Sequence, residues 1–397
     1  MDRDIIDFIS EALIDLYKEF NNTINVYTAI QLSKNLNNPQ TWKKHQMAQQ
    51  TQYRKAMKKL FKEFEQKINK PIENAFKEVN KEAKSDLDAK KKDVPNPQPD
   101  IKKFKAENAI ILAALFKKTQ SGFRRIVNDT QREIVRGKIT SGDELLKHIN
   151  KAMDRGIENM QKVVYRNGRQ VSYKAYMEMN VRTTMNQEAN NYQIEAARSV
   201  GAVFYLCSFF GDCAPDHAEF QGRIYYDEQW QSIAPKEQHE QIEQYISSNQ
   251  LMSLQSVRDQ KPYLTTRPNC RHKFKPLTIE QVLNKSDNQL LDEFKMKQGS
   301  YDKKKYLNLQ EQRRLERYVR KNKEEVDKYT ALRSNATTSE QKQYLDGLIK
   351  ESNAKVKNGQ SEIRSLLKKN PYLERDYRRE NYKTIVQDVG AKYNRDK

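Results

Sequence analysis

Apolar side chains recur every three or four residues along most of this 397-residue chain, which is the spacing of helices that bury one face. The first such stretch follows Asp2, a suitable N-cap, and is expected to stop at Asn21-Asn22. Its apolar positions are Ile5, Phe8, Ile9, Leu13, Leu16, Tyr17 and Phe20. The pattern therefore predicts an N-terminal helix with one buried face.

Two further helices are expected before residue 85. A stretch rich in lysine and glutamine, from about 40 to 70, predicts the first of them. Pro71 suits the first position of the other, over 72–84, because an N–H at that position has no partner to lose. Prolines on alternate positions cannot continue a helix, and Pro95, Pro97 and Pro99 therefore predict an extended linker over 94–100.

Helical spacing resumes between 101 and 136. Ser141 and Glu144, three residues apart, then form a capping-box pattern for a helix that is expected to end near Gly156. Apolar stripes return on charged helices after about Pro276, and Asn370-Pro371 is expected to break the last long one. No convincing internal repeat is present.

The centre of the chain has a different texture. The segments 163–165 and 170–173, joined by an Asn167-Gly168 turn, predict a β-hairpin. A long helix is expected from Tyr173 to about Val200, closed by Gly201. The apolar segment 203–210 is rich in β-forming residues and predicts a central strand.

These patterns predict an α+β protein that is predominantly α, with a small mixed α/β central domain flanked by long charged helical arms. The expected regions are an N-terminal helical region at 1–93, the linker at 94–100, a helical region at 101–160, the central domain with its Cys/His loop at 161–282, and a basic C-terminal helical region at 283–397.

Composition narrows the class of protein further. Charged residues make up 32% of the chain, against about 25% in typical globular domains. With only 12 glycines and 11 prolines, the chain is neither a β-sandwich, nor collagen-like, nor a glycine-rich disordered protein. The longest apolar run, 109–116, is much shorter than the ~20 residues of a membrane span. The start lacks a signal-peptide pattern, so we expect the chain to be cytoplasmic when made.

The net charge of +20 points to a polyanionic partner, either nucleic acid or an acidic protein surface. One helix is especially basic, and its candidate nucleic-acid contacts are Arg313, Arg314, Arg317, Arg320 and Lys321. Tyrosines are interleaved with them, as in proteins that bind single strands. The alternative is a solvated helix face, because acidic residues between 316 and 327 dilute the charge. Any binding is expected to be independent of sequence.

Cysteine and histidine gather between 207 and 272. Cys213-x3-His217 and Cys270-x-His272 each place two donors on one side of a short segment, and four such N/S donors suit tetrahedral zinc. A small loop-rich centre would gain folding free energy from such an ion. The alternative is ordinary buried thiols beside two polar histidines, and Cys207 is expected to be core. Three cysteines are too few for a disulfide framework.

Acidic residues surround His217 in the sequence, namely Asp212, Asp216 and Glu219. Carboxylates beside a histidine can perform general acid–base chemistry or bind a hard metal, as nucleases and hydrolases require. The alternative is a polar loop whose carboxylates pair with Arg182, Arg223 or Arg271. No nucleophile elbow, phosphate loop or zinc-protease motif accompanies them.

Several short motifs in order closely resemble the phage minor capsid protein 2 family, which is similar in turn to the Mu F-type head morphogenesis proteins. They are Gly168-Arg169, Tyr173-x2-Tyr176-x2-Met179-x2-Arg182-Thr183-Thr184, Pro215 to Tyr225 with Gln221-Gly222, and Pro268-Asn269-Cys270-Arg271-His272. The basic run from Gln312 to Lys321 is similar to the family's helix after this core. The resemblance covers about 165–330 well, and the flanks agree in helical character.

The resemblance implies a low-copy structural protein of a tailed phage, without enzymatic activity, located in the capsid interior near the portal. It implies roles in head assembly and in DNA packaging or release. Its expected partners are the portal protein, the major capsid and scaffold proteins, and packaged double-stranded DNA, with no membrane. The protein would reside in the host cytoplasm during assembly.

The Mu F-type pattern also bears on the metal. His217 lies five residues before Gly222, at the family's second cysteine position, and His272 takes the last cysteine position. Cys213 lies one residue away from the first position. The resemblance therefore makes zinc a possible cofactor, because a Cys-to-His exchange preserves ligation. The alternative to a metal is a purely structural loop in which His217, Gln221 and Gly222 fix a turn by hydrogen bonds. Two alternatives stay open: a metal-dependent nuclease or hydrolase that uses Asp216, His217 and His272, and a zinc-stapled nucleic-acid-binding module unrelated to virions.

Overall fold

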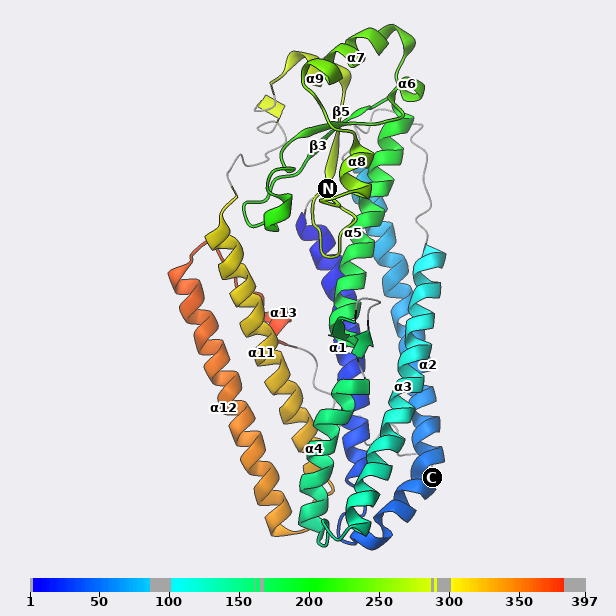
Figure 1. The fold of residues 1–397 in the computed structure, drawn as a ribbon, viewed down its shortest axis with the longest axis vertical. Coiled ribbons are helices and arrows are strands. Elements are labelled where there is room, and N and C mark those ends of the chain that lie inside the picture. The colour runs from blue at the N-terminus through cyan, green and yellow to red at the C-terminus, as the bar shows by residue number, and fades with distance from the viewer. Residues whose placement is uncertain are drawn as a thin grey trace. The chain divides into compact units, whose positions relative to one another are not determined.

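The computed structural model describes residues 3–85, 101–160, 162–164, 168–286, 289–290 and 301–381 (Figure 1). Helices predominate, and the strands form one sheet of two strands and one of three. The predicted α+β, predominantly α class is confirmed. The predicted linker over 94–100 and Asn167 lie outside the described residues.

Seven long helices, several short helical elements and five short strands make up the described part of the chain. The long helices are α1 (Arg3–Leu32), α2 (Pro39–Ser85), α3 (Ile101–Val135), α4 (Gly142–Met160), α5 (Tyr173–Ser199), α11 (Lys303–Arg333) and α12 (Ser339–Lys369). The short helical elements are η1 (Pro215–His217), α6 (Trp230–Ile233), η2 (Lys236–Gln238), α7 (His239–Ser248), α8 (Leu254–Asp259), α9 (Ile279–Asn284) and α13 (Tyr377–Glu380). The strands are β1 (Lys162–Val164), β2 (Gln170–Ser172), β3 (Phe204–Cys207), β4 (Ile224–Tyr226) and β5 (Phe274–Leu277).

Two compact units divide the chain, and each combines segments that are distant in the sequence. Unit 1 consists of Met1–Ala12, Pro71–Phe104 and Met179–Gln310. Unit 2 consists of Leu13–Lys70, Lys105–Glu178 and Glu311–Lys397. The domain boundaries expected from the sequence stay a prediction.

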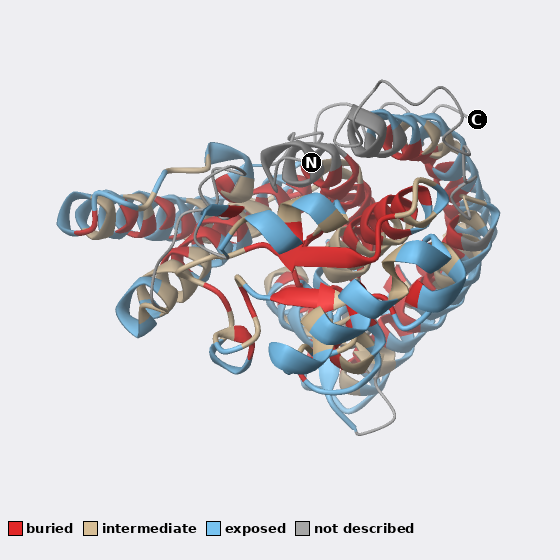
Figure 2. Cartoon of the chain, turned by 90° about the horizontal axis from the view of Figure 1, so that it is seen from above, coloured by how far each residue is buried: buried red, intermediate tan, exposed pale blue. Residues whose placement is uncertain are grey.

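The three-stranded sheet is the centre of unit 1. Its order is β4-β3-β5 with antiparallel pairing, so the segment expected to be a central strand is one. Alternate residues of β3 enter different cores, because successive strand side chains point to opposite faces. Tyr205 and Cys207 pack with residues of α5 and α8, whereas Phe204 and Leu206 pack with residues of α6, α7 and α9. The result is a sheet covered by helices on both faces (Figure 1), and strand arrows appear in red, the colour of buried residues, in Figure 2.

Local turn and capping chemistry follows the sequence closely. The hairpin forms between β1 and β2, with Val163 opposite Val171. Helix α5 is closed by Gly201, whose φ of 82° lies in the left-handed region that favours glycine. The capping box is present as well, because Glu144 N–H donates to Ser141 Oγ and Ser141 N–H donates to Glu144 Oε2, each at 3.2 Å. Helix α4 then continues past Gly156 to Met160.

The expected stop of the first helix at Asn21-Asn22 is wrong. Helix α1 continues to Leu32, because the asparagines are accommodated in the interior of unit 2. Asn22 is 1% exposed, and its Nδ2 donates to Asp327 Oδ2 at 2.8 Å. An asparagine that finds a buried partner has no reason to leave the helix for a turn.

The expected helix start at Pro71 is also wrong. Pro71 lies inside the continuous helix α2. Ile68 and Ile72 on either side of it are fully buried, and so is Phe76. Burial of each such side chain stabilises the helix by about 1.5–3 kcal/mol, and several of them outweigh the ~3 kcal/mol that an interior proline costs.

Unit 2 is stabilised by packing between long helices. Aromatic rings of α1, α2 and α3 stack there, with ring centroids 4.0 Å apart in both Phe20–Phe64 and Tyr53–Phe123. Leu315 and Val319 of α11 form a second cluster with residues of α12. Among the described helices of the whole chain, none is long and apolar enough to cross a bilayer.

Candidate metal centre

Sheet register brings the two Cys/His segments together. Leu206 pairs with Ile224 at the start of β4, and Cys207 pairs with Phe274 at the start of β5. The loop that precedes β4 and the segment that precedes β5 therefore meet at the Cys207 end of the sheet. The first carries His217 in η1, and the second carries Cys270 and His272.

The donor atoms of His217, Cys270 and His272 converge in the interior. All three residues are buried, and their ligand atoms lie within 4.8 Å of one another. The two Nδ1 atoms are 3.3 Å apart, and Cys270 Sγ lies 3.4 Å from Nδ1 of His272 and 3.8 Å from Nδ1 of His217. The described residues contain no other cluster of three such donors.

These separations fit the ligand shell of a tetrahedral zinc ion. Zn–N bonds of about 2.05 Å and a Zn–S bond of about 2.3 Å place nitrogens about 3.3 Å from each other and about 3.6 Å from the sulfur. The observed triangle of 3.3, 3.4 and 3.8 Å matches this requirement. Three protein donors leave the fourth position of such an ion for a water molecule or another donor.

Hydrogen bonds at the far side of each ring set the tautomers. His217 Nε2 lies 3.1 Å from the carbonyl oxygen of Pro262, which can only accept, so this nitrogen carries the proton. His272 Nε2 donates in the same way to Gln221 Oε1 at 3.2 Å. Phe210 N–H donates to that same oxygen at 2.8 Å, which fixes the orientation of the amide. In the neutral form of both rings, each Nδ1 is therefore unprotonated and offers a lone pair to the cluster.

Two lone pairs 3.3 Å apart repel each other unless a proton or a metal cation lies between them. A metal cation supplies the needed positive charge, and histidine ligands typically donate their other N–H to a carbonyl or amide oxygen as they do here. Burial lowers the pKa of His217, which keeps the ring neutral and able to ligate. Burial raises the pKa of the Cys270 thiol, and a coordinated cation would deprotonate it.

Backbone groups also prepare the cysteine. Thr265 N–H donates to Cys270 Sγ at 3.1 Å, a bond that favours the thiolate. Thr265 and Asn269 have φ of 66° and 61°, left-handed values that turn the loop around the sulfur. The protein's own backbone therefore positions the Cys270 sulfur.

One face of α5 clamps the loop through side chains that sequence reasoning did not select. Asn186 Nδ2 donates to Cys270 O at 2.9 Å, and Asn190 Nδ2 donates to His272 O at 3.2 Å. Asn190 Oδ1 also accepts from Phe274 N–H at 3.1 Å, and Gln187 Nε2 donates to Thr266 O at 2.8 Å. The sequence signal for these contacts was the pair Asn186 and Asn190, four residues apart on a helix face that would normally be apolar in a core.

The four predicted ligands do not all meet. Cys213 is outside the cluster, and its Sγ lies 3.3 Å from the carbonyl oxygen of Ala214. Burial raises the pKa of Cys213 to about 11. Cys207 is fully buried in β3, in agreement with the expected core role.

The carboxylates near His217 do not join the cluster. Asp216 and Glu219 are exposed, whereas His217 is buried. Asp216 forms an ion pair with Arg267, which was not among the partners that the sequence suggested. The arrangement offers no carboxylate at the donor atoms, so the acid–base constellation is not assembled among these residues.

The remaining motif residues surround the loop or lie apart from it. Thr183 Oγ1 accepts a hydrogen bond from Asn269 N–H at 3.0 Å. Gly222, directly after Gln221, has a φ of 69°, and the N–H of Gly222 donates to Cys207 O. Arg182 forms an ion pair with Glu11. The others are distant from the cluster in the sequence: Gly168 and Arg169, exposed before β2, and Tyr176, half-buried on α5.

The basic residues of α11 differ in their availability. Arg320 is 8% exposed, donates to Arg379 O at 3.1 Å and lies 3.2 Å from Glu178. Arg313 is half-buried, and Arg314 pairs with Glu311 at 2.7 Å. Arg317 and Lys321 are exposed and have no hydrogen bond or ion pair within the described part of the chain. Of the five predicted nucleic-acid contacts, Arg317 and Lys321 are therefore the two whose charge is unengaged within the described residues.

Comparison with known proteins agrees with the motifs. The profile of the phage minor capsid protein 2 family matches residues 2–368, which is most of the chain. No curated protein and no solved structure matches it. The match includes the metal-donor loops, the helix α5 that clamps them and the basic helix α11. The chain therefore belongs to the phage minor capsid protein 2 family.

Proposed function

We propose that this protein is a low-copy structural component of a tailed-phage head, held inside the capsid at the portal, where it takes part in assembly and in DNA packaging or release. The observation that carries the proposal is the family match over residues 2–368. Membership of this family places the protein in the virion among other virion proteins. The portal and the packaged DNA are the specific partners that we add.

The net positive charge of the chain supports a location next to packaged DNA. The chain carries 73 lysines and arginines against 53 acidic residues. Cations that neutralise phosphates release condensed counterions, so such contacts are strong, salt-dependent and independent of sequence. Exposed Arg317 and Lys321 on α11 are suited to contacts of this kind.

Burial of the donor cluster supports a structural role for its metal. His217 and His272 are each 2% exposed, and Cys270 is 7% exposed. A hydrolase needs a path from solvent to its metal-bound water, whereas a structural ion contributes its binding free energy to folding. When bound, zinc would join the loop before β4 to the segment before β5, and the asparagines of α5 would hold that second segment.

The test is quantitative mass spectrometry and cross-linking of purified particles. We expect a few copies per particle, cross-links to the portal protein, and retention in heads from which tails have been removed. Heads assembled without this chain should package or release DNA poorly. Recovery of the protein only in tails, or its absence from particles, would overturn the proposal.

A further inference from the structure

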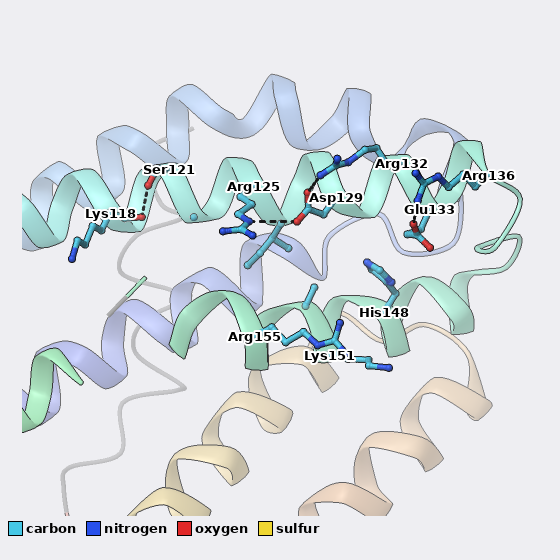
Figure 3. A pocket seen from close by; sticks show the side chains of 13 residues that line it. Lys118, Ser121, Arg125, Asp129, Arg132, Glu133, Arg136, His148, Lys151 and Arg155 are labelled. Atoms are coloured by element: carbon cyan, nitrogen blue, oxygen red, sulfur yellow. Dashed lines mark hydrogen bonds and ion pairs between the residues drawn. The ribbon is translucent and has the colours of Figure 1, made fainter. Parts of the chain in front are cut away.

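A groove between α3 and α4 in unit 2 is lined by an unusual density of basic side chains. It encloses about 850 Å³ (Figure 3). Three of the cations are on α3, one directly follows that helix and two are on α4: Lys118, Arg125, Arg132, Arg136, Lys151 and Arg155. Only Asp129 and Glu133 oppose them in the lining, so the groove has a net positive charge.

The cations are spread along the length of the groove and are not gathered at one place. From Lys118 to Arg136, the chain advances about 27 Å at 1.5 Å per residue. The basic positions recur at intervals of seven, seven and four residues, which keeps them on one helix face. A single small anion would use only a fraction of this length. An extended polyanion with regularly spaced charges would use all of it, and about eight base pairs of duplex cover the same distance.

The ion pairs inside the groove do not engage these arginines firmly. Arg125 and Arg132 both pair with Asp129, and their side chains are 75% and 67% exposed. Arg136 pairs with Glu133 at 2.9 Å and is 62% exposed. Exposed pairs of this kind contribute about 0–1 kcal/mol, so the guanidinium groups can turn toward a phosphate at little cost.

The α4 side of the groove contributes groups without partners. Lys151 and Arg155 are exposed and have neither a hydrogen bond nor an ion pair among the described residues. His148 lies between them and α3, and its Nε2 is buried without a hydrogen-bond partner in the described structure.

We propose that the groove between α3 and α4 binds the sugar–phosphate backbone of double-stranded DNA, without sequence preference. Lys151, Arg155 and the α3 arginines contact successive phosphates, and no side chain needs to read a base. The choice of DNA over an acidic protein rests on the proposed function, because packaged DNA is the polyanion inside a head. The groove is a different surface from the basic face of α11.

Binding of a labelled 20-base-pair duplex to the full-length protein, followed by fluorescence anisotropy between 50 and 200 mM salt, tests the proposal. The groove variant is Lys151→Ala with Arg155→Ala. The matched control, Lys357→Ala with Arg364→Ala, removes one exposed lysine and one exposed arginine from α12. Each lost phosphate contact lowers the slope of log K against log salt by about 0.9.

For the groove variant we expect a slope smaller by about 1.8 and an affinity that falls roughly tenfold less across this salt range than that of the wild type. The control should match the wild type, and both variants should keep its helical circular dichroism. Equal slopes for the groove variant and the wild type would overturn the proposal. So would a polyglutamate that displaces the duplex at equal charge, because it would assign the groove to an acidic protein. The assay uses no particles, so it can succeed even if the protein is found outside the head.

Discussion

The loop-rich centre of unit 1 and the helix packing of unit 2 are stabilised by different means. Around the metal donors, long stretches lack regular backbone pairing, and side chains such as Asn186, Asn190 and Gln221 supply hydrogen bonds to the loop backbone. In unit 2 the helices satisfy their own backbones, and aromatic stacking and apolar stripes hold them to one another. The comparison teaches that a polar loop needs specific partners atom by atom, whereas a helix pair needs close surface contact.

Loss of the proposed zinc ion should have the largest effect on this comparison. For Cys270→Ser or a chelated wild type, we expect loss of about one zinc per chain by elemental analysis. Stability of unit 1 should fall by about 4 kcal/mol if the free zinc exceeded its Kd a thousandfold. Hydrogen exchange should rise at β3 and stay unchanged at α12. Cys213→Ser is the matched control and should retain the ion, because Cys213 is outside the donor cluster. Full zinc content in Cys270→Ser would contradict the assignment.

Close contact in unit 2 predicts the next largest effect. A Cβ at Gly142 would lie 2.7 Å from the backbone oxygen of Leu36, which cannot move aside as a side chain can. We expect Gly142→Ala to lower the free energy of unfolding by about 2–3 kcal/mol, as overpacking does. Urea denaturation measures it. Gly347→Ala, where nothing lies within 4 Å, should instead stabilise the protein by about 0.4–1 kcal/mol.

Gln221 tests whether the loop depends on single polar partners. Its Oε1 accepts from both His272 Nε2 and Phe210 N–H. Gln221→Ala should weaken zinc binding about 10–100-fold, a change of about 1.4–2.7 kcal/mol, since such partners orient the ligand. Competition with a chromophoric chelator reports the affinity. Gln221→Glu keeps the acceptor and should recover most of it, whereas identical affinity in the alanine variant would show that the loop holds the ring unaided.

A buried carboxylate in α11 predicts an effect that appears only as the pH rises. Burial raises the pKa of Glu316 from 4.5 to about 7, although Arg379 and Gln312 lower it. Because the folded-state pKa is above the unfolded one, this group contributes stability below pH 4.5 that is lost as the pH rises through 7. Glu316→Gln should therefore be more stable than the wild type by up to about 3 kcal/mol at pH 8 and similar to it below pH 4.5.

The control for this pH dependence is Glu311→Gln on the same helix. The hydrogen bond from Arg314 lowers the pKa of Glu311, so its charge does not change between pH 5 and 8. Thermal denaturation of the three proteins across this range separates the two cases. A parallel decline of all three curves would remove Glu316 as the cause.

The sequence by itself determined the elements whose signals are local. Periodic apolar stripes, the pairing of the hairpin strands, the Ser141–Glu144 box and the strand at 203–210 depend on residues a few positions apart, and each was predicted correctly apart from its ends. The pair Cys270 and His272 belongs here too, since two residues of one extended segment necessarily lie close together.

Only the tertiary structure decided the rest. His217 joins the pair from 53 and 55 residues away because strand register brings its loop to the same end of the sheet, while Cys213 in that loop stays outside. Asn22 and Pro71 failed as helix boundaries because buried partners outweighed their local preferences. The basic groove has the same origin: its charges belong to two helices, and the line that they form exists only after α3 and α4 pack.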